Sequence, residues 1–215
     1  MHMDRRQFVK NLGLGTASLS MGSLVTASSC APSGDSSLKQ NVKEGEDGQF
    51  LFIGDDIAIA QTEYGKVQGY LLNHVYTFLG VPYGADTSGK NRFMPPQKPE
   101  PWTDVRPAVF YGNTAPQRME NRWPNNYGTF ADHWNYWDVS EDCLYLNVWT
   151  PGIADGKKRP VLVWLHGGGF TNGSGIEQDG YHGENISREG DIVFCSINHR
   201  LGPIGFSDLS GVGGE

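Results

Sequence analysis

His166-Gly167-Gly168-Gly169-Phe170 directly follows the apolar run Val161-Leu162-Val163-Trp164-Leu165, and this junction decides the fold class. A short apolar run that ends at glycines is typical of a strand buried in a parallel sheet. Three consecutive glycines leave backbone N–H groups uncovered, and an acyl-transfer enzyme needs such donors where the oxyanion of its tetrahedral intermediate forms. The stretch predicts an oxyanion loop with Gly168 and Gly169 as donors; a tight turn that simply needs glycine is the alternative.

The surrounding segments predict more sheet. We expect a hairpin of residues 57–62 and 66–71, further strands at 75–79, 143–149, 160–166 and 192–197, and a short helical turn at 184–189. Frequent prolines between residues 80 and 142 disfavour regular helix there. Strand, glycine loop, short helix and strand is the order found in a mostly parallel α/β sheet.

Composition restricts the classes of protein. The 215 residues include 17 Lys and Arg and 24 Asp and Glu, so the net charge is −7; residues 31–215 carry 14 basic and 23 acidic residues, a balance of −9. Such an acidic body lacks the basic footprint of a nucleic-acid binder, so no nucleic-acid partner is expected. Three Cys cannot form a disulfide framework. Beyond residue 30, no run approaches the roughly 18 uncharged apolar residues of a membrane helix.

The first 30 residues have the layout of an export signal. Arg5 and Arg6 precede an uncharged stretch, residues 11–29, which resembles a twin-arginine (Tat) signal that the Tat translocase reads. A chance arginine pair is the alternative. Ala27-Ser28-Ser29-Cys30 resembles a bacterial lipobox, although Leu is usual where Ala27 stands. Lipid attachment at Cys30 and ordinary cleavage at residues 27–31 both remain open.

Residues 31–48 are rich in Ser, Gly, Lys and Glu and predict a flexible tether between this signal and the body of the protein. We therefore expect export by Tat to the periplasm or to the bacterial envelope. A lipid on Cys30 would be the only contact with a membrane.

Five motifs in order resemble the type B carboxylesterases, the family that includes the cholinesterases and bacterial para-nitrobenzyl esterases. The motifs are Phe78-Leu79-Gly80-Val81-Pro82-Tyr83, Arg92-Phe93 with Pro95-Pro96 and Pro101-Trp102, Ser140-Glu141-Asp142-Cys143-Leu144-Tyr145-Leu146-Asn147-Val148-Trp149, the glycine loop, and Asn198-His199-Arg200-Leu201-Gly202 with Gly205-Phe206. His199 stands where the family has Tyr. The resemblance implies an α/β fold, the incomplete N-terminal part of an α/β-hydrolase with a small β-sheet and the first strands of the main sheet. It also implies hydrolysis of a small-molecule carboxylic ester through an acyl-serine intermediate, with neither cofactor nor metal.

Two features depart from the family. Thr114-Ala115-Pro116-Gln117 lacks the Cys that in the family precedes Pro-Gln and bridges to the Cys of EDCL, so Cys143 is expected to be a free thiol. No G-x-S-x-G elbow occurs in the sequence, so nucleophile, acid and base are none of these 215 residues. We interpret residues 49–215 as the N-terminal portion of a longer esterase, inactive toward esters on its own. The rival hypothesis is a non-enzymatic, cholinesterase-like binding domain.

Several other residues with reactive side chains receive a structural interpretation. The resemblance implies an ion pair between Arg92 and Glu141. The histidines show no metal-ligand spacing, and His166 is expected to form a structural hydrogen bond beside the glycine loop.

The remaining expectations concern two strand residues and one aromatic segment. Cys195 should be buried and inert. The strand at 192–197 should have an open edge that promotes aggregation of this chain alone. Residues 123–137 hold six aromatics and resemble the cholinesterase gorge loop, with Trp134 as a substrate contact or as packing onto the body.

Overall fold

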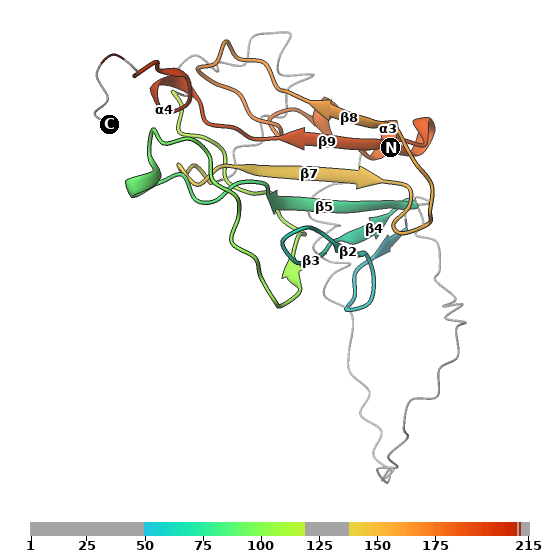
Figure 1. The fold of residues 1–215 in the computed structure, drawn as a ribbon. Helices are drawn as coiled ribbons and strands as arrows, with labels where there is room; N and C mark the ends of the chain where they lie inside the picture. The colour runs from blue at the N-terminus through green and yellow to red at the C-terminus, as the bar shows by residue number, and fades with distance from the viewer. Residues whose placement is uncertain (1–49, 119–137, 210, 212–215) are drawn as a thin grey trace, which may run out of the picture. The chain divides into compact units, whose positions relative to one another are not determined.

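The computed structural model describes residues 50–118, 138–209 and 211. Its strands form a six-stranded sheet in the order β1-β4-β5-β7-β9-β8 and a three-stranded sheet in the order β2-β3-β6. Figure 1 shows β4, β5, β7, β9 and β8 side by side. The predicted export signal with Arg5, Arg6 and Cys30, the tether at 31–48 and Trp134 all lie outside the described residues.

The elements lie close to the predicted ones. The strands are β1 Leu51–Phe52, β2 Ile59–Gln61, β3 Lys66–Gln68, β4 Tyr70–Leu72, β5 Val75–Pro82, β6 Arg106–Pro107, β7 Tyr145–Thr150, β8 Val161–Trp164 and β9 Val193–Ile197. The helices are α3 Glu184–Gly190 and α4 Gly202–Phe206, with 3-10 turns η1 Gly89–Asn91 and η2 Asp179–Tyr181. No sequence pattern predicted α4.

The predicted hairpin forms, but its second strand is divided. β2 and β3 pair in antiparallel register, whereas β4 belongs to the other sheet. The division falls at Gly69, where a Cβ atom would overlap the carbonyl oxygen of Thr77. The prediction of one continuous strand over 66–71 was therefore wrong. β4 returns to β5 through Asn73 and His74, whose φ angles of 48° and 66° suit the tight two-residue turns of hairpins.

The six-stranded sheet is mixed rather than mostly parallel. Within the described residues, β8–β9 is its one parallel pair, and the pairs β1–β4, β4–β5, β5–β7 and β7–β9 are antiparallel. A parallel pair needs a crossover, and α3 lies in the connection between β8 and β9. The expected strand–helix–strand order is confirmed there, but it does not extend to the earlier strands.

At the end of the sheet opposite β1, the edge strand is β8, not β9. β9 lies between β7 and β8 and buries Phe194, Cys195 and Ser196, which confirms the buried position of Cys195. The four residues of β8 are between 37% and 63% exposed, so the expectation of a buried strand at this position was wrong. Among the described residues β8 has β9 as its single neighbouring strand, and Tyr181 packs on Trp164 with ring centroids 5.0 Å apart, while Val161 and Val163 are more than half exposed.

This exposure leads to a prediction for the polypeptide 31–215 expressed alone. We expect it to self-associate through β8, because an uncapped apolar edge pairs with other chains. Val163→Lys should shift the size-exclusion profile toward monomer, and a matched charge at the exposed Ile186 on α3 should not. Equal association of both variants would contradict the role of β8.

The buried hydrophobic residues form more than one cluster: Phe78 and Val81 of β5 pack with Ala58, Val67 and Ala108, and a second cluster lies on the side of the sheet against which α3 packs. Trp149 of β7 is 1% exposed and clusters with Val75, Leu79 and Phe194. The Ser187 hydroxyl of α3 donates to the Trp149 carbonyl oxygen at 3.0 Å. In the same sheet, the Asn147 side chain accepts from Gly80 N–H and donates to Ser196, so one amide ties β5, β7 and β9 together. In the ranges that the structure describes, no helix is long and apolar enough to cross a bilayer.

Candidate active site

The glycine loop turns sharply at the carboxyl end of β8. Gly168 and Gly169 have φ angles of 123° and 60°, in the left-handed region, and Phe170 follows at 63°. A Cβ atom on Gly168 would overlap the carbonyl oxygen of Asn172, so glycine is required there by space as well as by conformation. At Gly169 the space around a Cβ is open, and only the backbone angle favours glycine.

The carbonyl groups of the loop are anchored. His166 Nδ1 lies 2.8 Å from the Gly167 oxygen, and because a carbonyl only accepts, the nitrogen must be the donor. The Gly168 oxygen accepts from Thr171 N, Thr171 Oγ1 and Asn172 N at 3.1, 3.1 and 3.2 Å. The structural hydrogen bond expected for His166 is thereby confirmed.

The anchored carbonyls orient two N–H groups. Gly167 C=O and Gly168 N–H share one planar peptide, as do Gly168 C=O and Gly169 N–H. Fixing each oxygen therefore fixes the N–H on the opposite side of the plane. Within residues 50–118 and 138–209, neither of these N–H groups donates to a partner. The loop thus presents two oriented donors, both in exposed residues.

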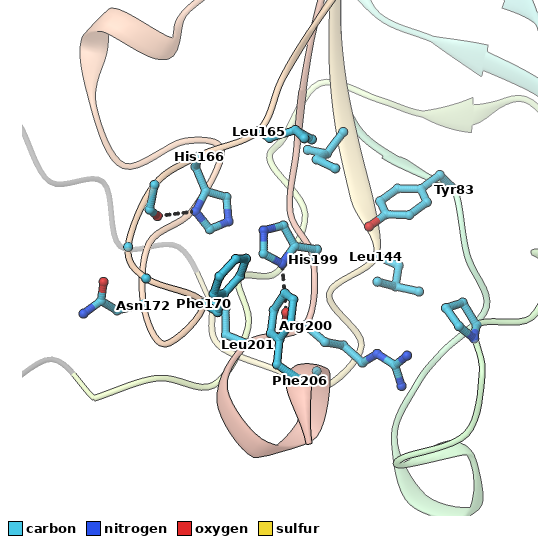
Figure 2. Close-up of a pocket in the computed structure, with 16 residues that line it drawn as sticks. Tyr83, Leu144, Leu165, His166, Phe170, Asn172, His199, Arg200, Leu201 and Phe206 are labelled. Carbon is cyan, nitrogen blue, oxygen red and sulfur yellow. Dashed lines mark hydrogen bonds between the residues drawn. The ribbon is translucent and has the colours of Figure 1, made fainter. Parts of the chain in front are cut away.

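A pocket of about 530 Å³ lies beside these donors. Figure 2 shows the aromatic wall of this pocket. In it the rings of His166 and His199 face each other, and Phe170 and Phe206 lie near them. The two imidazoles stack at 4.5 Å with planes 5° apart, and Phe170 and Phe206 lie 4.7 Å apart. This wall can receive the apolar part of a small molecule whose polar group reaches the glycine loop.

The residues behind the pocket are tied to the ends of β7 and β9. Asn198 receives a hydrogen bond from Gly175 N–H on its side-chain oxygen and gives one to the Asn113 carbonyl. Its own carbonyl accepts from the Tyr83 hydroxyl at 2.7 Å, and burial raises the pKa of Tyr83 to about 12. Tyr83 therefore remains a neutral donor at ordinary pH. The sequence motifs contain Tyr83 and Asn198, but they do not indicate that these two residues are joined by a hydrogen bond.

The predicted ion pair forms at the surface. Arg92 Nε lies 2.8 Å from Glu141 Oε2, with the two side chains 48% and 18% exposed, so the pair ties the proline-rich segment to the residues that precede β7 without a buried charge. Asp142 accepts instead from the Tyr145 hydroxyl at 2.8 Å. The two neighbouring acids thus have separate structural partners. Within the described part of the chain, no three His, Cys, Asp or Glu side chains gather as metal ligands.

Cys143 is a free thiol, as predicted, and it is fully buried. It clusters with Ala115 and Leu201. Ala115 therefore packs against Cys143 at the position where the family has the second cysteine of a disulfide. Burial raises the pKa of the Cys143 thiol to about 12 and that of Cys195 to about 11.

Both thiols should therefore be inert in the folded protein. The thiolate is the reactive form, so we expect no alkylation of either by iodoacetamide at pH 8, and full alkylation in urea. In the unfolded chain a thiol ionises near pH 8.5. Because the folded pKa is the higher one, the neutral thiols stabilise the fold below that pH, and stability falls as the pH rises above it. Mass spectrometry of the alkylated peptides measures the extent of labelling. Rapid alkylation of Cys143 in the native protein would contradict the expectation that the thiol is inert.

Comparisons with known proteins agree with the sequence motifs. The profile described as "Carboxylesterase family" matches residues 56–212. The chain is 45% identical over 157 residues to the phenmedipham hydrolase of Pseudarthrobacter oxydans, covering 73% of this chain and 30% of that protein. It is 39% identical over 155 residues to the para-nitrobenzyl esterase of Bacillus subtilis, covering 71% and 29%.

A comparison with solved structures also finds an esterase. An esterase from Clostridium hathewayi, described as able to hydrolyse aliphatic aromatic polyesters, superimposes with a TM-score of 0.67 at 38% identity, covering 77% of this chain and 31% of its own. The chain therefore spans about 30% of the length of the relatives it matches.

Proposed function

Because the chain belongs to the carboxylesterase family and has the N-terminal part of an α/β-hydrolase fold, we propose that it supplies the oxyanion hole of a carboxylic ester hydrolase. The observation that carries the proposal is the pair of oriented N–H groups of Gly168 and Gly169, which have no partner among the described residues and lie beside an apolar pocket. In this site the ester carbonyl oxygen points at the two donors, which stabilise the negative charge that develops on it.

The nucleophile is proposed to reach the site from the exposed edge of the sheet. In parallel sheets, sites form at the carboxyl ends of the strands, and β8 runs directly into the glycine loop. A further strand beside β8 would end next to Gly168. We propose that this strand leads into the serine elbow of the full-length protein, and that the acid and the base come from the same additional sequence.

The reaction then runs in two steps. The serine oxygen attacks the ester carbonyl carbon while the histidine base takes the hydroxyl proton, and the oxyanion rests on Gly168 and Gly169. Collapse expels the alcohol, which receives the proton. Water, activated by the same base, then releases the carboxylic acid from the acyl-serine.

The experiment uses the full-length protein and p-nitrophenyl acetate. We expect a burst of p-nitrophenolate equal to the enzyme concentration, and covalent labelling of one serine by a p-nitrophenyl phosphonate. The Ser→Ala variant at the labelled position is the control and should lose both signals. A folded full-length protein with neither burst nor label would support the rival binding domain instead.

Export remains a separate proposal, supported by the sequence of residues 1–30 alone. Changing Arg5 and Arg6 to Lys should leave the precursor in the cytoplasm, because the Tat receptor reads the arginine pair. Normal arrival of this variant in the periplasm would end the Tat hypothesis.

Labelling with a radioactive fatty acid that disappears in Cys30→Ala would establish the lipid anchor, and absence of label in the parent would refute it.

A further inference from the structure

A side chain far away in the sequence holds the back of the glycine loop. Gln117 Oε1 accepts from Gly173 N–H at 2.8 Å, and Gln117 Nε2 donates to the Gly173 carbonyl at 3.0 Å. The same Nε2 group donates to the Ala115 carbonyl at 3.1 Å. The amide thus pairs with both backbone groups of Gly173, much as a neighbouring strand would, across 56 residues of sequence.

Gly173 in turn lies directly against the start of the loop. It is buried, its φ angle is 107°, and a Cβ atom there would overlap the Gly167 oxygen and the His166 ring. The backbone of Gly173 is therefore in close contact with the Gly167 carbonyl and with the imidazole that donates to it. A shift of Gly173 would have to move this carbonyl as well.

The Gly167 carbonyl belongs to the peptide that carries the Gly168 N–H. Because that peptide is planar, a rotation or displacement of its oxygen re-aims the donor on the other side. We propose that Gln117 is a positioning residue of the oxyanion hole: it fixes Gly173, which fixes the Gly167–Gly168 peptide. The inference rests on the proposed esterase function and extends it to a residue that touches no substrate.

The anchor of Gln117 is itself rigid. Ala115, which receives one of its hydrogen bonds, is 2% exposed and packs with Cys143 and Leu201. Pro116 between them restricts the backbone. The side chain therefore extends from a fixed support toward Gly173 and transmits that support to the loop.

Gln117→Glu keeps the size of the side chain and changes its hydrogen bonding. A carboxylate still accepts from Gly173 N–H, but it cannot donate to the carbonyls of Gly173 and Ala115 and instead repels them. Gln97→Glu is the matched control, because Gln97 also follows a proline and donates to the carbonyl two residues before it, at Pro95, and in the described residues no hydrogen bond joins its side chain to the loop.

The measurement is kcat and KM of the full-length enzyme for p-nitrophenyl acetate, per active site titrated with a phosphonate. We expect Gln117→Glu to lower kcat by about 10- to 100-fold, since misplacement of a catalytic group by an ångström can cost that much, with KM within twofold. Gln97→Glu should leave kcat unchanged. The ratio of kcat in Gln117→Glu to kcat in the parent should rise as the pH falls toward about 4.3, because the neutral carboxyl regains a donor.

A purely structural role would give a different pattern. It would lower the melting temperature and the number of titratable sites and leave kcat per site unchanged, which would overturn the proposal. If the parent itself shows neither turnover nor titration, the proposed function fails, and hydrogen exchange decides the inference. Gln117→Glu should then speed amide exchange in residues 167–173 relative to Gln97→Glu; equal rates would refute the positioning role.

Discussion

Gly168→Ala in the full-length enzyme should lower kcat for p-nitrophenyl acetate by about 100- to 1000-fold, the loss found when one oxyanion donor is removed. The new methyl group would overlap the Asn172 carbonyl oxygen, so the loop must move and the Gly168 N–H can no longer point at the oxyanion. The loss should appear mainly in kcat per titrated site, because the substitution removes no side chain of the apolar wall that we propose to bind the substrate.

Two other glycines provide the comparison. Gly169→Ala meets open space and suffers only from its φ angle of 60°, so its loss should be smaller. Gly180→Ala in η2 also meets open space and should leave kcat unchanged. An order with Gly169→Ala as the most damaging, or equal activity in all three variants, would contradict the geometry described for the loop.

Trp149→Ala should be the most destabilising single change in the described core, by about 3–5 kcal/mol. The indole is 1% exposed and fills the space between β5, β9 and α3, with Phe194 at 5.8 Å and His182 at 5.1 Å between ring centroids. Burial beside the indole lowers the pKa of His182, which favours the neutral imidazole in this contact. Urea unfolding of the full-length protein measures the effect.

Trp149→Phe separates packing from hydrogen bonding. In the described residues, the Trp149 indole N–H is buried without a partner, which costs about 1–3 kcal/mol. Phenylalanine removes that unpaired group while it keeps most of the ring contacts, so its loss of stability should be less than half that of Trp149→Ala. Equal losses would show that the indole N–H is satisfied in the whole enzyme.

The sequence predicted most elements because their signals are local. The glycine run, the proline-rich stretch and the apolar run of β9 each depend on a few adjacent residues. The split at Gly69 was missed because it depends on the approach of Thr77 from the next hairpin. The burial of β8 was also predicted wrongly, since apolar composition shows that a strand is suited to a covered position but not which residues cover it.

For the site, the sequence predicted the donors but not their supports. Gly168 and Gly169 stand in a motif whose composition alone indicates uncovered N–H groups. Gln117 and Asn198 act through side-chain contacts with backbone groups 56 and 23 residues away, and no periodicity or spacing reveals such pairs. The stacking of His199 on His166 likewise arises only when β8 and β9 lie side by side.

The most direct test of the oxyanion hole is a crystal structure of the full-length protein after reaction with a p-nitrophenyl phosphonate. The phosphonyl group mimics the tetrahedral intermediate, and its free oxygen takes the place of the oxyanion. We expect this oxygen about 2.7–3.1 Å from both Gly168 N and Gly169 N, with the Gly167 carbonyl still bonded to His166. A phosphonyl oxygen that faces other donors, with both glycine N–H groups left empty, would contradict the account.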